Sequence, residues 1–128
     1  MAQIVYFSLT GQTRRFVEKL PQYTALEIDP VNPFIENSED FILVVPTYER
    51  PVVEVVDDFL QTADNQSYCQ GIFGGGNRNF AQLFCFTAKD MARDYQLPLL
   101  HLFEFQGSDY DVDQLKNALE AFRETTNH

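Results

Sequence analysis

Short apolar runs alternate along the chain with segments in which apolar residues recur every three or four positions. The runs have the length of β-strands, whereas the spaced segments have the period of amphipathic α-helices. The run at 41–45 is apolar throughout, which is typical of a strand that is covered on both faces. Strands are therefore expected at, or within, five segments: 4–7, 23–28, 41–45, 68–73 and 97–105.

Four amphipathic segments are predicted to be helices. Their periodic positions are Thr13, Phe16, Val17 and Leu20 in the first, Val53, Val56 and Leu60 in the second, Phe84, Ala88, Met91, Ala92 and Tyr95 in the third, and Val112, Leu115, Leu119 and Phe122 in the fourth. Pro21 is expected to end the first helix, and Pro51 fits the first turn of the second. Asp111 with Gln114 resembles a capping box at the start of the fourth.

Strands that alternate with helices predict right-handed βαβ units around a parallel sheet, and hence an α/β fold. One connection departs from this pattern, because the segment 29–40 holds two prolines and shows no helical period. We expect a loop or one short turn there instead of a full helix. The length of 128 residues is typical of one domain, so residues 1–128 are expected to form a single unit.

Composition and charge argue against two classes of partner. The formal net charge is −10, and among the nine basic residues only Arg14 and Arg15 are adjacent. Nucleic acid is therefore not expected as a partner, because phosphate backbones are bound by clustered Lys and Arg. The apolar runs are too short to span a bilayer, and the first residues lack the basic region of a secretory signal. We expect a cytoplasmic protein with no membrane partner, in which the only cysteines, Cys69 and Cys85, are free thiols.

Three segments that follow predicted strands are candidates for a binding site: SLTGQT at 8–13, PTYERP at 46–51 and GGGNRNF at 74–80. In open parallel sheets, ligands bind beyond the carboxyl ends of the strands. The three segments are therefore expected to gather at one edge of the sheet.

The first segment has the chemistry of an anion site. Ser8, Thr10 and Thr13 offer hydroxyls, and Gly11 allows a tight turn immediately before a helix. A helix N-terminus with free N–H groups and nearby hydroxyls suits a phosphate group. It is not a Walker loop, because the G-x-x-x-x-G-K-[ST] string is absent. A plain N-cap with a turn glycine is the structural alternative.

The other two segments suit a flat ring. Tyr48 offers an aromatic face at a strand end, or lies over the edge of the sheet without a ligand. GGGNRNF fails the dinucleotide fingerprint, because Asn79 stands where that motif needs glycine or alanine. Its glycines would let the backbone approach a ring, Asn77 and Asn79 offer donors and acceptors, and Phe80 could lie against the ring. The alternative is a tight strand-to-helix turn with Asn79 as the N-cap.

The sequence does not support other functions that occur on this architecture. A phosphoacceptor receiver needs acidic residues after the first strand, an Asp after the third and a Lys after the fifth. This chain has SLTG, PTYE and EFQG at those three places. A small cysteine phosphatase needs Arg six residues after its Cys, where this chain has Gly75 and Met91. His101 and His128, the only histidines, form neither a metal cluster nor a Ser-His-Asp set, so no metal site is expected. Cys69 is expected to be a buried strand residue, and a helix dipole next to Cys85 would lower its pKa.

The motifs resemble those of a known family. S-x-T-G-x-T after the first strand is similar to the phosphate loop of flavodoxins. GNRNF, together with F-E-x-x-G-S at 103–108, resembles the NrdI family of small flavodoxin-like flavoproteins that work with class Ib ribonucleotide reductases, over essentially the whole chain. This resemblance implies a flavodoxin-like three-layer α/β/α sandwich with a five-stranded parallel sheet in the order 2-1-3-4-5.

The resemblance also implies FMN as the cofactor and a reductase subunit as the partner. The implied FMN-binding residues are Ser8, Leu9, Thr10, Gly11, Gln12 and Thr13 of the first segment, Pro46, Thr47, Tyr48 and Glu49 of the second, and Gly74, Gly75, Gly76, Asn77, Arg78, Asn79, Phe80 and Cys85 of the third. Reduced FMN would convert O2 into superoxide for the radical-generating subunit, where a dimanganese centre and a tyrosyl radical are activated. An unidentified reductant would reduce the flavin again, and no side chain would act as acid, base or nucleophile.

The second segment departs from the flavodoxin pattern. Many relatives carry glycine there, and a glycine can flip its peptide to present a carbonyl to the reduced flavin, whereas YERPVVE has none. We expect Glu49 or Arg50 to supply that carbonyl, with a weakly stabilised semiquinone. Two other functions stay open at this point: a generic flavodoxin electron carrier, and a cofactor-free binding partner of the reductase subunit.

Overall fold

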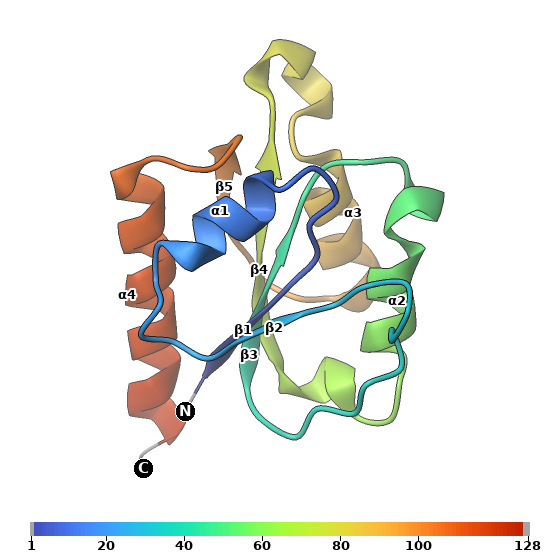
Figure 1. Ribbon diagram of the computed structural model, residues 1–128, viewed down its shortest axis with the longest axis vertical. Helices are drawn as coiled ribbons and strands as arrows, with labels where there is room; N and C mark the ends of the chain where they lie inside the picture. The colour runs from blue at the N-terminus through green and yellow to red at the C-terminus, as the bar shows by residue number, and fades with distance from the viewer. Residues whose placement is uncertain (1, 127–128) are drawn as a thin grey trace.

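Five parallel strands form one sheet in a computed structural model that describes residues 2–126 (Figure 1). The strands are β1 (Gln3–Tyr6), β2 (Ala25–Glu27), β3 (Phe41–Val45), β4 (Cys69–Gly76) and β5 (Leu99–Glu104). Their order is β2-β1-β3-β4-β5, and each neighbouring pair is parallel, as expected. The strand predicted at 41–45 is confirmed as β3, and all of its residues are buried.

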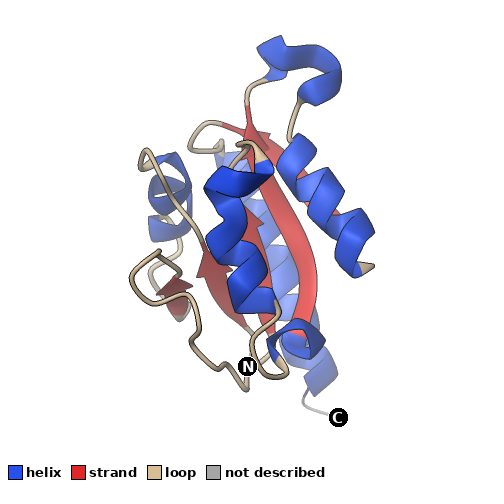
Figure 2. Cartoon of the chain, turned by 90° about the vertical axis from the view of Figure 1, so that its right-hand side faces the viewer, coloured by secondary structure: helices blue, strands red, loops and turns tan. Residues whose placement is uncertain are grey.

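Four α-helices cover the two faces of this sheet, so the fold has three layers, as expected (Figures 1 and 2). Helices α1 (Gln12–Glu18) and α4 (Asp109–Thr126) pack on one face, and α2 (Glu54–Leu60) and α3 (Phe86–Tyr95) pack on the other. Short 3-10 helices precede α2, β4 and α3: η1 (Arg50–Val53), η2 (Asn65–Tyr68) and η3 (Arg78–Leu83).

Each face of the sheet has its own apolar core. On the α1/α4 face, Phe16 stacks on Phe103 with ring centroids 4.0 Å apart. On the α2/α3 face, Phe59 packs edge-on against Phe41. Alternate residues of the strands supply the two cores, because successive strand side chains point to opposite faces.

The connection between β2 and β3 contains no helix, as expected: residues 28–40, all of them described, form turns, bends and irregular segments. The fully buried Asn65 of η2 holds this connection in place of a helix. Its amide group donates to the carbonyls of Ile35 and Phe59, and its Oδ1 accepts from the Asn37 N–H at 2.7 Å. These bonds satisfy backbone groups that a helix would have satisfied internally.

Several predicted boundaries differ from the structure, among them the starts of α3 and α4. Helix α3 begins at Phe86 instead of Phe84, after the separate 3-10 helix η3. The capping box of α4 is formed by Ser108 and Asp111, not by Asp111 and Gln114. The Ser108 N–H donates to Asp111 Oδ2 at 2.8 Å, and the Asp111 N–H donates back to Ser108 Oγ at 3.2 Å. Among residues 2–126, no helix combines the length and the apolar character that crossing a membrane requires.

Candidate functional site

A pocket of about 180 Å³ lies at the carboxyl edge of the sheet, where the three candidate segments meet. Its lining comprises Ser8, Leu9, Thr10, Gln12, Thr13, Pro46, Thr47, Tyr48, Gly75, Gly76, Asn77, Phe80, Leu83 and Phe105. Hydroxyl, amide and aromatic groups dominate this lining, and it contains no Asp, Glu, His, Lys, Arg or Cys. The pocket therefore offers neutral hydrogen-bonding groups and aromatic rings to a ligand.

The first segment turns sharply at Gly11 before α1 begins. Gly11 has a φ of 97°, a left-handed conformation that glycine adopts without steric cost. Ser8 Oγ accepts a hydrogen bond from the Arg14 N–H at 3.2 Å, so it caps the first turn of α1. Thr13 is buried and also lines the pocket. Hydroxyls and backbone N–H groups thus converge at the entrance to the helix.

The basic residue nearest this turn in sequence is paired with a carboxylate. Arg14 makes two hydrogen bonds to Glu27, at 2.9 and 2.7 Å, and Tyr6 donates a third at 2.8 Å. The Arg14 hydrogen bond lowers the pKa of Glu27. Burial, followed by the bond to Glu27, raises the pKa of Tyr6 to about 12. An anion at this turn would therefore be bound by neutral donors and not by the Arg14 charge.

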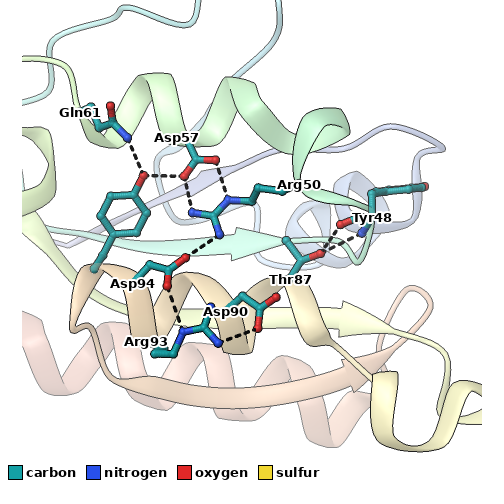
Figure 3. A network of polar contacts seen from close by, with 9 residues as sticks. Tyr48, Arg50, Asp57, Gln61, Thr87, Asp90, Arg93 and Asp94 are labelled. Atoms are coloured by element: carbon teal, nitrogen blue, oxygen red, sulfur yellow. Dashed lines mark hydrogen bonds and ion pairs between the residues drawn. The ribbon is translucent and has the colours of Figure 1, made fainter.

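The Thr87 side chain of α3 and a backbone turn fix the second segment, residues 46–51, in place. Thr87 Oγ1 accepts from the Tyr48 N–H at 2.9 Å and donates to the Tyr48 carbonyl at 2.6 Å (Figure 3). The Glu49 carbonyl accepts from the Val52 N–H at 2.9 Å, within the first turn of η1. The carbonyl expected from Glu49 is therefore engaged inside the protein.

The Arg50 side chain anchors the end of this segment to both neighbouring helices (Figure 3). It makes a bidentate pair with Asp57 of α2, at 2.7 and 2.6 Å, and a further pair with Asp94 of α3 at 2.8 Å. Tyr95 also donates to Asp57. Bidentate guanidinium–carboxylate pairs fix geometry as well as charge, so Arg50 holds the segment against α2 and α3.

The glycines of the third segment belong to the end of β4 and not to a loop. Gly74 pairs with Val45 and Leu102, and Gly76 pairs with Glu104. A Cβ at Gly74 would lie 2.4 Å from the Ala88 Cβ of α3. A Cβ at Gly75 would lie 2.8 Å from the Phe103 ring, in the core of the α1/α4 face. These glycines are therefore required by the packing of helix and sheet.

Beyond β4 the chain projects from the body of the protein as η3 (Figures 1 and 2). The N-cap of η3 is Asn77, whose Oδ1 accepts from the Asn79 N–H at 2.9 Å, so the alternative of Asn79 as N-cap is wrong. Phe80 and Leu83 are 62% and 60% exposed and line the mouth of the pocket. Ala81 has φ 51° and ψ −113°, a strained conformation for a residue with a Cβ.

Most of the expected binding residues line the pocket, but Gly11, Glu49, Gly74, Arg78, Asn79 and Cys85 do not. Arg78 pairs with Glu104 at 3.1 Å and lies over the Phe84 ring. Cys85 is fully buried, and its Sγ lies 3.4 Å from the Gly74 carbonyl oxygen. Burial raises the pKa of this thiol to about 11, so the expected lowering by a helix dipole is wrong.

Two lining residues were not expected. Phe105 follows β5 directly and is 51% exposed. Its position at the carboxyl end of the fifth strand is a sequence signal for it, because parallel strands end at the same edge of the sheet. Leu83 directly precedes the apolar pattern that predicted the third helix, and no sequence signal separates it from a core residue.

Comparison with known proteins gives matches over most of the chain. A model described as NrdI flavodoxin-like matches residues 4–117. A protein named NrdI from Bartonella tribocorum is 38% identical over 128 residues, which is 95% of this chain and 96% of that protein. The protein of the same name from Wigglesworthia glossinidia brevipalpis is 34% identical over 130 residues, covering 95% and 91% of the two chains.

Solved structures match the fold at lower identity. A short-chain flavodoxin associated with a non-canonical PDU bacterial microcompartment has a TM-score of 0.67 at 19% identity, covering 97% of each chain. The Streptococcus pneumonia TIGR4 flavodoxin has a TM-score of 0.62 at 16% identity, covering 93% of this chain and 94% of that one. At these identities the likeness concerns the fold alone.

Proposed function

The chain belongs to the NrdI flavodoxin-like family, and from that premise we propose that it binds FMN and activates the radical-generating subunit of a class Ib ribonucleotide reductase. The observation that carries this proposal is the composition of the pocket at the carboxyl edge of the sheet. Its lining offers neutral donors and aromatic rings and contains no carboxylate, imidazole, amine, guanidinium or thiol group. Such a site suits a cofactor that performs the chemistry itself.

The residues of the lining divide into two groups by their chemistry. Ser8, Thr10 and the backbone of the Gly11 turn would bind the phosphate, because they supply hydroxyl and N–H donors at the start of α1. Tyr48 and Phe80 would contact the isoalloxazine ring, because they are aromatic residues of the lining that follow the neighbouring strands β3 and β4. When bound, reduced FMN would supply an electron to O2, giving superoxide as the oxidant for the dimanganese centre of the partner.

The exposed edge of the site is consistent with delivery to another protein. Leu9, Phe80, Leu83 and Phe105 line the pocket and are each more than half exposed. The site therefore opens to solvent through an apolar rim, which gives O2 and a partner access to the cofactor. Because ribonucleotide reduction supplies the cell's own DNA synthesis, we propose that the protein acts in the cytoplasm.

The decisive experiment has two stages. Flavin absorbance of the protein reconstituted with FMN distinguishes this proposal from a cofactor-free binding partner, which would stay colourless. The reduced protein is then mixed with O2 and a manganese-loaded reductase subunit, and tyrosyl radical is counted by electron paramagnetic resonance. Radical formation is the expected result. A reduced protein that passes electrons to unrelated acceptors but forms no radical would instead be a generic electron carrier.

A further inference from the structure

One buried hydroxyl on α3 holds both polar groups of a single residue in the second segment. Thr87 is 1% exposed, and its Oγ1 bonds the N–H and the carbonyl of Tyr48 at once (Figure 3). A threonine hydroxyl has one hydrogen to donate, and here the Tyr48 carbonyl receives it. The carbonyl is therefore held toward α3 by a bond that only the hydroxyl can make.

The backbone on the far side of Tyr48 is held independently of Thr87. The Glu49 carbonyl is engaged by the Val52 N–H, and the Arg50 guanidinium is paired with Asp57. Loss of the Thr87 hydroxyl would therefore release the two peptide groups that flank Tyr48 and leave the rest of the segment anchored. This makes Thr87 a site at which the backbone of one residue, Tyr48, can be tested alone.

We propose that Thr87 is a positioning residue that keeps the Tyr48 carbonyl turned to α3 and so limits how well the site stabilises a singly reduced flavin. The inference rests on the proposed function. A flavin that takes up one electron and one proton gains an N–H donor, and a backbone carbonyl free to turn toward it would stabilise that form. The Thr87 hydroxyl competes for this carbonyl, and no glycine in the segment eases a peptide flip.

The first test needs no cofactor. Exchange of the Tyr48 amide hydrogen is measured by NMR in the flavin-free protein and in Thr87→Val, which keeps the shape of the side chain and removes the hydroxyl. We expect exchange to be faster by about fivefold to tenfold, the factor that one hydrogen bond is worth. Thr87→Ser should retain the wild-type rate. Equal rates in Thr87→Val and wild type would overturn the proposed positioning role.

The second test uses the FMN-loaded protein. Anaerobic reduction followed by absorbance gives the fraction of singly reduced flavin, which should rise by about fivefold in Thr87→Val and stay unchanged in Thr87→Ser. Thr62→Val is the matched control, because its hydroxyl also donates to a backbone carbonyl, that of Asp58, but at the other end of α2. Thr87→Ala serves as a second hydroxyl-free variant if Thr87→Val does not fold.

The outcomes separate this inference from the proposed function. Wild-type protein that binds no FMN overturns both. Normal FMN binding with identical titration curves in wild type and Thr87→Val overturns only the role of Thr87. A rise that appears equally in Thr62→Val also overturns it, because the effect would then follow from lost stability and not from the Tyr48 carbonyl.

Discussion

The close approach of α3 to β4 predicts that a single added methyl at Gly74 destabilises the protein. In Gly74→Ala the new Cβ would lie 2.4 Å from the Ala88 Cβ, whereas carbon atoms pack at about 3.5–4.0 Å. Neither atom can rotate away, because each is fixed to its own backbone. Helix and strand must therefore separate by about 1 Å, and overpacking of this kind costs about 1–3 kcal/mol.

A thermal melt measures this cost, and a second glycine provides the control. For a domain of 128 residues, 1–3 kcal/mol lowers the Tm by about 4–11 °C. Gly71→Ala places its Cβ 2.5 Å from Leu100 Cδ1 and 2.6 Å from Leu100 Cγ, but both atoms belong to a partly exposed, flexible side chain that can rotate away. The Tm of Gly71→Ala is therefore expected to stay within about 2 °C of the wild type, as for other tolerated substitutions.

A double-mutant cycle tests the mechanism directly. Ala88→Gly alone should cost about 1 kcal/mol or more, because it puts glycine inside a helix and removes a buried methyl. Combined with Gly74→Ala, it makes room for the new methyl, so the double variant should be more stable than the sum of the single effects by at least about 1 kcal/mol. Strict additivity, or a Gly74→Ala variant as stable as Gly71→Ala, would refute the packing argument.

Three further predictions follow from the site and its surroundings. Ala81→Gly should raise the Tm by about 4 °C, because Ala81 is exposed and strained at φ 51°, and relief of that strain outweighs the added chain entropy by about 1 kcal/mol; an unchanged or lower Tm contradicts this. Thr10→Val should weaken FMN binding about tenfold and leave riboflavin binding unchanged in fluorescence titrations, because only FMN carries a phosphate; equal losses for both ligands would place the hydroxyl elsewhere. The pKa of Glu27 is lowered by Arg14, so the stability that this carboxylate adds is complete above its unfolded pKa of about 4.3 and is lost as the pH falls through its folded pKa. Glu27→Gln should thus be less stable than wild type in urea unfolding at pH 7, and the difference in stability should shrink as the pH falls below about 4.3. A difference that stays constant with pH argues against the ion pair.

The layers of the fold could be predicted from the sequence because its apolar periods are clear. The run at 41–45 is apolar throughout and forms the buried central strand β3. The prolines and the lack of period in 29–40 correctly indicated a connection without a helix. The end of β4 could not be found in this way, because three glycines have low strand propensity and their role depends on partners distant in sequence.

The position of the site was predictable, but the contacts within it were not. Parallel strands bring their carboxyl ends to one edge, so the segments after the first, third and fourth strands had to meet there. The Thr87 hydrogen bonds to Tyr48 join residues 39 apart in sequence, and the residue types Thr and Tyr do not by themselves predict such a pairing. The burial of Cys85 likewise depends on β4 and β5, which cover its thiol and raise its pKa.

The packing of β4 and the positioning of the second segment both depend on the close approach of α3 to β4. Ala88, which meets Gly74, is the neighbour of Thr87 on α3, so the approach that glycine permits also brings the Thr87 hydroxyl within 2.6 Å of the Tyr48 carbonyl oxygen. A shift of about 1 Å at Gly74→Ala would lengthen this bond beyond useful hydrogen-bond geometry. The Tyr48 amide should then exchange faster in Gly74→Ala than in Gly71→Ala, although neither substitution touches the pocket side of that segment. Equal exchange in the two variants would mean that Thr87 follows Tyr48 when α3 moves, and that β4 does not influence the second segment.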